Sequence, residues 1–270
     1  MEPMRTRGRW ACLAALLGVS YPAPAQPGCV SAPPGISAWF TFDEPLFRQP
    51  GDHRPQRVPG LVGSALRFNG IDQYFEIPAS TPGLDVGEDD FTIELWIRTK
   101  QSVNTPPSIV DKRGHQPIGY LIYIYQGRPG LQLVDGGMAS GAGAGTGFAD
   151  GRWHHVAGVV KRLPPQAAAM FVDGVRQDTA TRYATLSNLD VPQPLWLGRH
   201  HANRLVDREN IYFQGDIDEL TFYRRALTEK EIQSIYRAGS HGKCRAGQDK
   251  KGASGNGRLP AVHTDFQSLQ

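Results

Sequence analysis

Two aspartates near the C-terminal end have the residue type and spacing that suit acid-base chemistry. Asp216 and Asp218 lie two positions apart in the stretch FQGDIDELTFYRRAL. Strand side chains alternate between faces, so both carboxylates are expected on one face. Retaining glycosidases use two carboxylates about 5 to 5.5 Å apart, one as nucleophile and one as acid. The predicted faces are Asp216, Asp218, Leu220 and Phe222 on one side and Ile217, Glu219, Thr221 and Tyr223 on the other.

Paired histidines are a second candidate for chemistry, this time metal binding. His154 and His155 are adjacent in a predicted strand, where neighbours point to opposite faces and cannot easily hold one ion. Trp153, on the face of His155, is expected to pack in the core, and His155 to be a hydrogen-bonded imidazole. His200 and His201 fall in an Arg-rich loop, which either contacts a ligand or is solvated.

Aromatic side chains supply the remaining chemistry. Tyr123 and Tyr125 share one face of a predicted strand, while Tyr120 lies on the other face with the apolar side chains. An exposed tyrosine can stack on the apolar face of a sugar ring while its hydroxyl forms a hydrogen bond. We therefore take Tyr123, Tyr125 and Arg199 as candidate ligand-binding residues, with core packing as the alternative for the aromatic ones.

The elements that must position these residues are mostly β-strands. Short apolar or alternating runs separated by Gly and Pro predict strands at 64–68, 91–98, 119–125, 131–134, 153–161 and 168–172. Asp173-Gly174 predicts a tight hairpin turn. Thr228 and Glu231 form a capping box at the start of a helix that ends at Ala238. The predicted fold is all-β, a two-sheet antiparallel sandwich or jellyroll with one short C-terminal helix.

The two ends of the chain differ from the part between them. Residues 1–25 combine three arginines, a short apolar run and Ala23-Pro24-Ala25, which is typical of a cleavable signal peptide and of secretion to an extracellular or periplasmic space. Residues 246–270 are polar, glycine-rich and without periodicity, which predicts a disordered tail. Residues 26–245 are expected to form one domain, and no run in them is long enough for a membrane span.

Charge argues against a nucleic-acid partner. Loss of residues 1–25 lowers Lys+Arg from 29 to 26 and Asp+Glu from 26 to 25, so the formal net charge falls from +3 to +1. Phosphate binding needs a clustered basic face, and most of the remaining basic excess lies in the tail.

Of the three cysteines, Cys12 would leave with the signal peptide, and two would remain in an oxidising compartment. We expect a disulfide between Cys29 and Cys244. Two free buried thiols are the alternative, and a zinc site is disfavoured because no further ligands stand at metal spacing.

Several motifs in a fixed order resemble those of the LamG-like jellyroll family, within the concanavalin A-like lectin/glucanase group. The resemblance covers Cys29 to Cys244 and rests on these stretches: WFTFD at 39–43, ALRFNG at 65–70, FTIELWI at 91–97, DGRWHHVA at 150–157, MFVDG at 170–174, FQGDIDELTFYRRAL at 213–227 and AGSHGKC at 238–244. We interpret the chain as a non-catalytic binding module, in the first place for a glycan and alternatively for a cell-surface or extracellular protein. A glycoside-processing enzyme is a further possibility, but the Glu-x-Asp-x-x-Glu pattern of related glucanases is absent.

The resemblance also implies a structural calcium ion. Similar domains often hold a cation beside two aspartates that correspond to Asp43 and Asp218. Asn69, Gly70 and Asp72 in a neighbouring turn offer further oxygens, and a simple hydrogen-bonded turn is the alternative for these residues. This sequence departs from the family at 45–59, which is rich in Pro, Arg and His. An arginine from that loop, Arg48, Arg54 or Arg57, offers an alternative partner for the same carboxylates.

Overall fold

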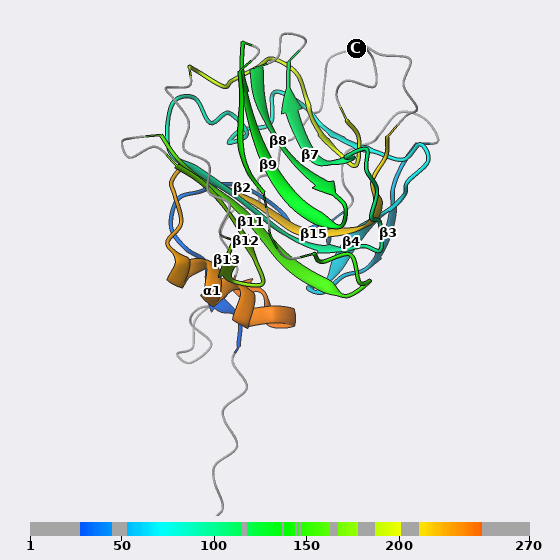
Figure 1. The fold of residues 1–270 in the computed structure, drawn as a ribbon. Helices are drawn as coiled ribbons and strands as arrows, with labels where there is room; N and C mark the ends of the chain where they lie inside the picture. The colour runs from blue at the N-terminus through cyan, green and yellow to red at the C-terminus, as the bar shows by residue number, and fades with distance from the viewer. Residues whose placement is uncertain are drawn as a thin grey trace, which may run out of the picture.

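The computed structural model describes residues 28–44, 53–114, 118–136, 138–143, 145, 147–162, 167–177, 187–200 and 211–244. Two antiparallel sheets pack face to face, and a short helix lies on the far side of the larger one (Figure 1). This is the predicted β-sandwich of jellyroll type with a single C-terminal helix among the described residues. The predicted signal peptide and the predicted tail lie outside the described residues.

The larger sheet has eight strands, one of which, β2, pairs with β15 beside the main path. Its strand order along that path is β13-β12-β11-β6-β15-β4-β3. The strands are β2 (Ile36–Phe40), β3 (Gln56–Pro59), β4 (Ser64–Asn69), β6 (Phe91–Arg98), β11 (Trp153–Lys161), β12 (Ala167–Val172), β13 (Val175–Arg176) and β15 (Gln214–Tyr223). The turn between β12 and β13 has positive φ at Asp173 and at Gly174, as predicted for the hairpin.

The smaller sheet has six strands in the order β10-β9-β8-β7-β14-β5. They are β5 (Phe75–Ile77), β7 (Ser108–Arg113), β8 (Ile118–Tyr125), β9 (Arg128–Asp135), β10 (Met138–Gly143) and β14 (Leu195–Leu197). Alternation along β8 is as predicted, because Tyr120, Ile122 and Ile124 are buried in the core between the sheets. Tyr123 and Tyr125 therefore lie on the outer face of this sheet.

The predicted faces of β15 are wrong beyond Asp218. Its register with β6 shifts between Asp218 and Thr221, and Glu219 has a φ of 54°, so the strand contains a β-bulge at this point. The extra residue restores Leu220 and Phe222 to the core beside Ile217. Asp216, Asp218, Glu219, Thr221 and Tyr223 consequently all lie on the outer face of the large sheet, the face turned away from the small sheet.

The helix covers part of that outer face. It runs from Glu229 to Ala238 (α1), and the Thr228 side chain accepts from the Glu231 backbone in the predicted capping box. Its buried residues Ile232 and Ile235 pack in a second apolar cluster with side chains from β11, β12 and β15. Among the described residues, no helix is long and apolar enough to cross a membrane.

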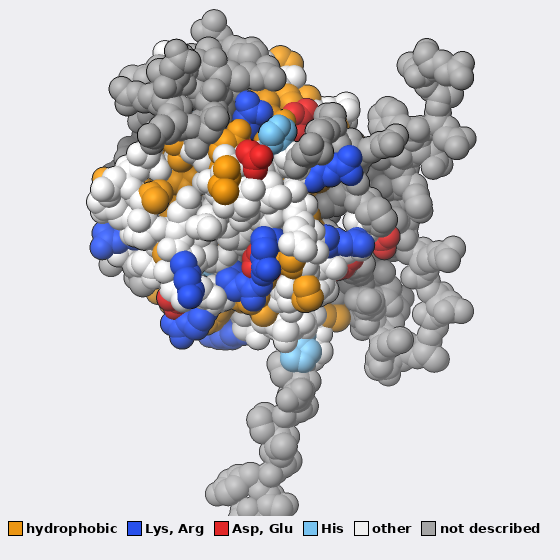
Figure 2. All heavy atoms as spheres, turned by 90° about the vertical axis from the view of Figure 1, so that its right-hand side faces the viewer, with side chains coloured by type: hydrophobic (Ala, Val, Ile, Leu, Met, Phe, Trp, Pro, Cys, Tyr) orange, Lys and Arg blue, Asp and Glu red, His pale blue; other side chains and the backbone are white. Residues whose placement is uncertain are grey.

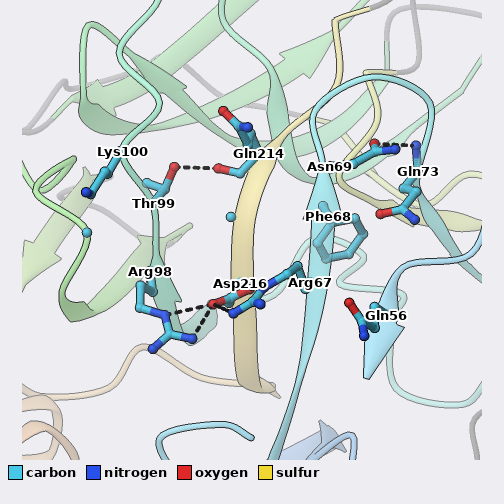
Figure 3. A pocket seen from close by; sticks show the side chains of 12 residues that line it. Gln56, Arg67, Phe68, Asn69, Gln73, Arg98, Thr99, Lys100, Gln214 and Asp216 are labelled. Atoms are coloured by element: carbon cyan, nitrogen blue, oxygen red, sulfur yellow. Dashed lines mark hydrogen bonds and ion pairs between the residues drawn. The ribbon is translucent and has the colours of Figure 1, made fainter. Parts of the chain in front are cut away.

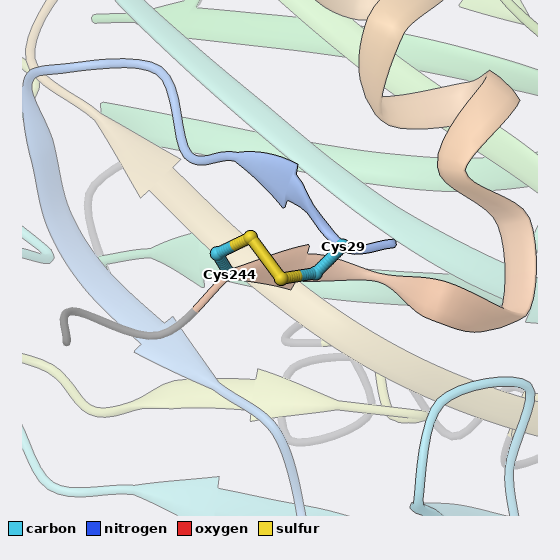
Figure 4. The surroundings of a disulfide bond; sticks show 2 residues. All are labelled: Cys29 and Cys244. Carbon is cyan, nitrogen blue, oxygen red and sulfur yellow. A yellow bond between two sulfur atoms is a disulfide. The ribbon is translucent and has the colours of Figure 1, made fainter. Parts of the chain in front are cut away.

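The two ends of the domain are joined. Short strands β1 (Val30–Ser31) and β16 (Lys243–Cys244) pair in parallel, and Cys29 and Cys244 form a disulfide with Cα atoms 4.8 Å apart (Figure 4). The predicted disulfide is thereby confirmed. The bond joins two cysteines that are 215 positions apart in the sequence.

A group of charged side chains is fully buried on the outer face of the large sheet, next to this junction. We call Glu94, His155, Glu219 and Lys243 the sealed cluster; each is exposed by less than 5%. The Lys243 ammonium lies 2.7 Å from Glu94 Oε1 and 3.5 Å from Glu219 Oε2, and His155 Nε2 lies 3.0 Å from Glu94 Oε2. Burial alone raises the pKa of Glu94, but Lys243 and His155 outweigh it and bring that pKa down to about 2.

Candidate functional site

An open groove of about 610 Å³ crosses the large sheet at the ends of β4, β15 and β6 (Figure 3). It is lined by Gln56, Arg67, Phe68, Asn69, Gln73, Arg98, Thr99, Lys100, Gly151, Gln214, Gly215 and Asp216. Nearly all of these side chains are polar, and the charged ones are mostly basic.

Strand register places a charged triad at the base of the groove. Asp216 on β15 stands directly opposite Arg67 on β4 and Arg98 on β6, so the three side chains form one row across adjacent strands. Arg67 Nε donates to Asp216 Oδ1 at 2.8 Å, and Arg98 Nε and Nη2 donate to Oδ2 at 2.7 and 2.6 Å. The Asp216 side chain is only 5% exposed, whereas Arg67 and Arg98 are 49% and 32% exposed. The carboxylate thus holds both guanidinium groups at the surface.

Among the other polar side chains of the groove, Thr99 donates to the backbone carbonyl of Gln214 and Asn69 bonds Asp72, but four have no such partner in the described part of the chain. Lys100 and the side-chain amides of Gln56, Gln73 and Gln214 form no hydrogen bond or ion pair with any residue that the structure describes. These donors and acceptors are available to a ligand.

Trp153 flanks the groove and is not the core residue that the sequence predicted. The guanidinium carbon of Arg98 lies 4.8 Å from the centre of its ring, and the residue is only partly buried. It stands at the start of β11, directly opposite Arg98, and so lies on the outer face of the large sheet and not in the core between the sheets.

The residues predicted to bind a ligand lie on the other sheet. Tyr123 lies across Gly130 of the neighbouring strand, and Tyr125 is 43% exposed at the end of β8. Arg199 follows β14, two strands away, and its guanidinium stacks 4.8 Å from the ring centre of Tyr74. None of the three lines the groove.

The predicted calcium ligands separate into two pairs. Asp43 and Asp218 both hold the turn between β3 and β4: Asp43 Oδ1 accepts from the Ser64 backbone at 2.8 Å, and Asp218 Oδ2 accepts from Leu61 and Val62 at 2.9 Å each. Arg57 donates to the backbone carbonyl of Asp43. Arg48 lies outside the described residues.

Asn69 and Asp72 lie at the opposite end of β4. Asn69 Nδ2 donates to Asp72 Oδ1 at 2.8 Å, and Asn69 Oδ1 accepts from the backbone of Ile71. They form the hydrogen-bonded turn that was the alternative to ligation. The sequence did not reveal that Asn69 and Asp72 lie at the other end of β4 from Asp43 and Asp218.

Asp218 has one property that fits a cation. Its Oδ1 atom is buried and has no hydrogen-bond partner among the residues that the structure describes, and burial raises the pKa of the carboxyl to about 7. In the described part of the chain, no three His, Cys, Asp or Glu side chains gather as a metal site, so calcium bound here would rely on Asp43, Asp218, backbone carbonyls and water.

The histidines bind different partners, as the alternation predicted. His154 contacts Asp173 and Asp150 at 2.8 and 3.0 Å, whereas the ring of His155 reaches Glu94 and leaves Nδ1 without a partner among the described residues. His200 lies 3.1 Å from an Arg113 nitrogen, and His201 lies outside the described residues.

Sequence reasoning missed the groove. The signal was a charged residue at the outward position of each of three strands, Arg67, Arg98 and Asp216. Only the strand order, which the sequence does not reveal, places the three side by side.

Residues 69–233 match the family model described as the concanavalin A-like lectin/glucanases superfamily. This match spans more than half of the chain. The protein belongs to the concanavalin A-like lectin/glucanases superfamily. No curated protein matches the sequence significantly.

Solved structures show the superfamily fold at low identity. Domain 4 of AbnA, an extracellular GH43 arabinanase from Geobacillus stearothermophilus solved with arabinotriose, aligns with a TM-score of 0.55 and 17% identity over 74% of this chain and 97% of that one. The binding domain of Paraclostridial Mosquitocidal Protein 1 aligns with a TM-score of 0.55 and 18% identity, over 68% of this chain and 45% of that one. The botulinum neurotoxin serotype D binding domain aligns with a TM-score of 0.54 and 10% identity, over 68% of this chain and 45% of that one. The chain therefore spans less than half the length of the two toxin domains.

Proposed function

We propose that this protein is a secreted, non-catalytic module that binds glycans through the groove across β4, β15 and β6. The observation that carries the proposal is the set of polar groups that line it. Amide, guanidinium and ammonium groups converge on an open surface, and several of them have no partner among the described residues.

Such a lining suits a saccharide. Sugar hydroxyls both donate and accept hydrogen bonds, so planar amides and guanidinium groups can pair with them. The partly buried indole of Trp153, at the edge of the groove, offers an apolar surface of the kind on which sugar rings stack. The arabinanase domain solved with arabinotriose supports the same class of ligand within the fold.

Glycoside hydrolysis is the competing function, and the geometry favours it less. Asp218 is fully buried, and its carboxylate holds a turn. Asp216 is bound by two arginines. A substrate could not reach both carboxylates without dismantling these contacts.

Secretion agrees with the disulfide and with the fold. A protein ligand at a cell surface is the third possibility. It would require an apolar contact area, because protein interfaces have a core depleted of charged residues.

A glycan array probed with the purified mature protein tests the proposal, together with an assay for new reducing ends on every polysaccharide bound. Saturable binding without turnover is expected. Turnover that Asp216→Asn abolishes would replace the binding function with catalysis, and an array without any bound saccharide would contradict the proposal.

A further inference from the structure

The groove carries an excess of positive charge at its base. Arg67 and Arg98 share the single carboxylate of Asp216, and Lys100 adds a cation that no described residue neutralises. Counted formally, these four side chains sum to two positive charges. On the side of the molecule that carries β3 and β4, several Lys and Arg side chains are exposed, with fewer Asp and Glu side chains among them (Figure 2).

The two guanidinium groups are held with donors to spare. Asp216 accepts from Nε and Nη2 of both arginines, and the Nη1 atoms form no hydrogen bond with described residues. The Trp153 ring also supports Arg98. Because Asp216 and Trp153 already fix these long side chains, binding costs them less rotamer freedom than it would cost free arginines.

The remaining Nη1 and Nη2 hydrogens of each arginine form a second pair of donors, and such a pair fits an anion with two or three oxygens better than it fits a hydroxyl. Charge-assisted hydrogen bonds from guanidinium to carboxylate are shorter and about twice as strong as neutral ones. Water and salt screen part of this charge, because the arginines are partly exposed. The screening is incomplete, because the protein forms the floor of the groove and water reaches the arginines from one side only. A neutral sugar would leave this excess positive charge uncompensated.

We propose that the groove selects acidic glycans, with the carboxylate or sulfate of one sugar bound by Arg98, Arg67 and Lys100. The neighbouring sugars contact the amides of Gln56, Gln73 and Gln214. This inference rests on the proposed glycan-binding function and names the class of glycan. The groove volume of about 610 Å³ lies in the usual range for a ligand site, which accommodates a short oligosaccharide.

Isothermal titration of the full mature protein with matched polymers tests it. The arms are polygalacturonate, its methyl-esterified form, dextran sulfate and dextran. Binding is expected for polygalacturonate or dextran sulfate, which distinguishes carboxylate from sulfate, and is expected to fall by about tenfold or more in the matching neutral polymer.

Two substitutions locate the interaction. Lys100→Gln changes a side chain without a described partner, so the fold is retained, and Arg98→Gln leaves Asp216 paired with Arg67. Each is expected to weaken binding of the acidic polymer by about tenfold. Arg98→Lys keeps the charge but loses the fork, and should restore only part of the affinity. Arg176→Gln is the matched control, because Arg176 is an exposed arginine on β13, at the opposite edge of the same sheet.

The outcomes separate the two claims. Equal binding of acidic and neutral polymers overturns the acidic selectivity and retains the glycan-binding function. Binding of the acidic polymer that Arg176→Gln weakens as much as Lys100→Gln shows general polyelectrolyte attraction, and overturns the site. If none of the four polymers and no glycan on the array binds, the proposed function itself fails.

Discussion

Two charged groups lie on the same outer face of the large sheet, and they differ in their access to water. The sealed cluster includes Lys243 of β16, and its side chains are exposed by less than 5%. The arginines of the groove stand open on β4 and β6 of the same sheet, and the carboxylate that holds them lies on β15. The first arrangement can only hold the protein together, whereas the second can also receive a ligand.

β15 links the two regions. Along it, Asp216 belongs to the groove, Asp218 holds the turn before β4, and Glu219 belongs to the sealed cluster. Alternation places Asp216 and Asp218 on one face, and the β-bulge at Glu219 brings the third carboxylate to the same face. Three acidic residues within a stretch of four therefore have different roles, because each carboxylate has different neighbours.

The largest expected effect comes from removing the cation of the sealed cluster. Lys243→Met leaves Glu94 buried without its nearest positive charge, and should lower the free energy of unfolding by about 3 to 5 kcal/mol. Urea unfolding followed by fluorescence measures it. Lys100→Met in the groove is the matched control, and should change stability by no more than about 0.5 kcal/mol. Equal effects of the two substitutions would abolish the distinction between the regions. Adding Glu94→Gln to Lys243→Met should recover part of the loss.

Acid should weaken the sealed cluster next. The pKa of Glu94 is about 2 in the fold and 4.5 as the ordinary value, so the carboxylate stabilises the folded state above pH 4.5, and this contribution is lost as pH falls through 2. Between pH 6 and about pH 2.5 the loss is about 2 to 3 kcal/mol. Urea unfolding at a series of pH values should show a shallower decline for Glu94→Gln than for the wild type. Parallel declines would mean that Glu94 titrates normally.

Calcium should give the smallest effect, at the turn between the two regions. An ion bound by Asp43 and Asp218 at tenfold excess over its Kd stabilises the fold by about 1.4 kcal/mol, which raises Tm by a few degrees. Thermal melts in EDTA and in millimolar calcium measure the shift. Asp43→Ala should abolish it, whereas Asp72→Ala should not, because Asp72 lies at the other end of β4. Superimposable wild-type melts would leave both aspartates as hydrogen-bonding residues of the turn.

Local pattern predicted the elements well, and non-local pairing explains what it missed. β6 and β11 begin and end where alternation placed them, and the capping box fixes the start of α1. Alternation failed at Glu219, since a bulge inserts a residue without any mark in the sequence. The groove was missed for a related reason: Arg67, Arg98 and Asp216 are far apart in the chain, and only register brings them together.

The disulfide also determines how the domain responds to tension. Segments before Cys29 and after Cys244 leave from neighbouring positions, because β1 and β16 run side by side. A pull applied between those segments is carried by the covalent Cys29–Cys244 bond. The chain between the two cysteines, which are 215 positions apart in the sequence, bears no load. While the bond is intact, the groove keeps its shape under a force that would otherwise peel the sheet open from its ends.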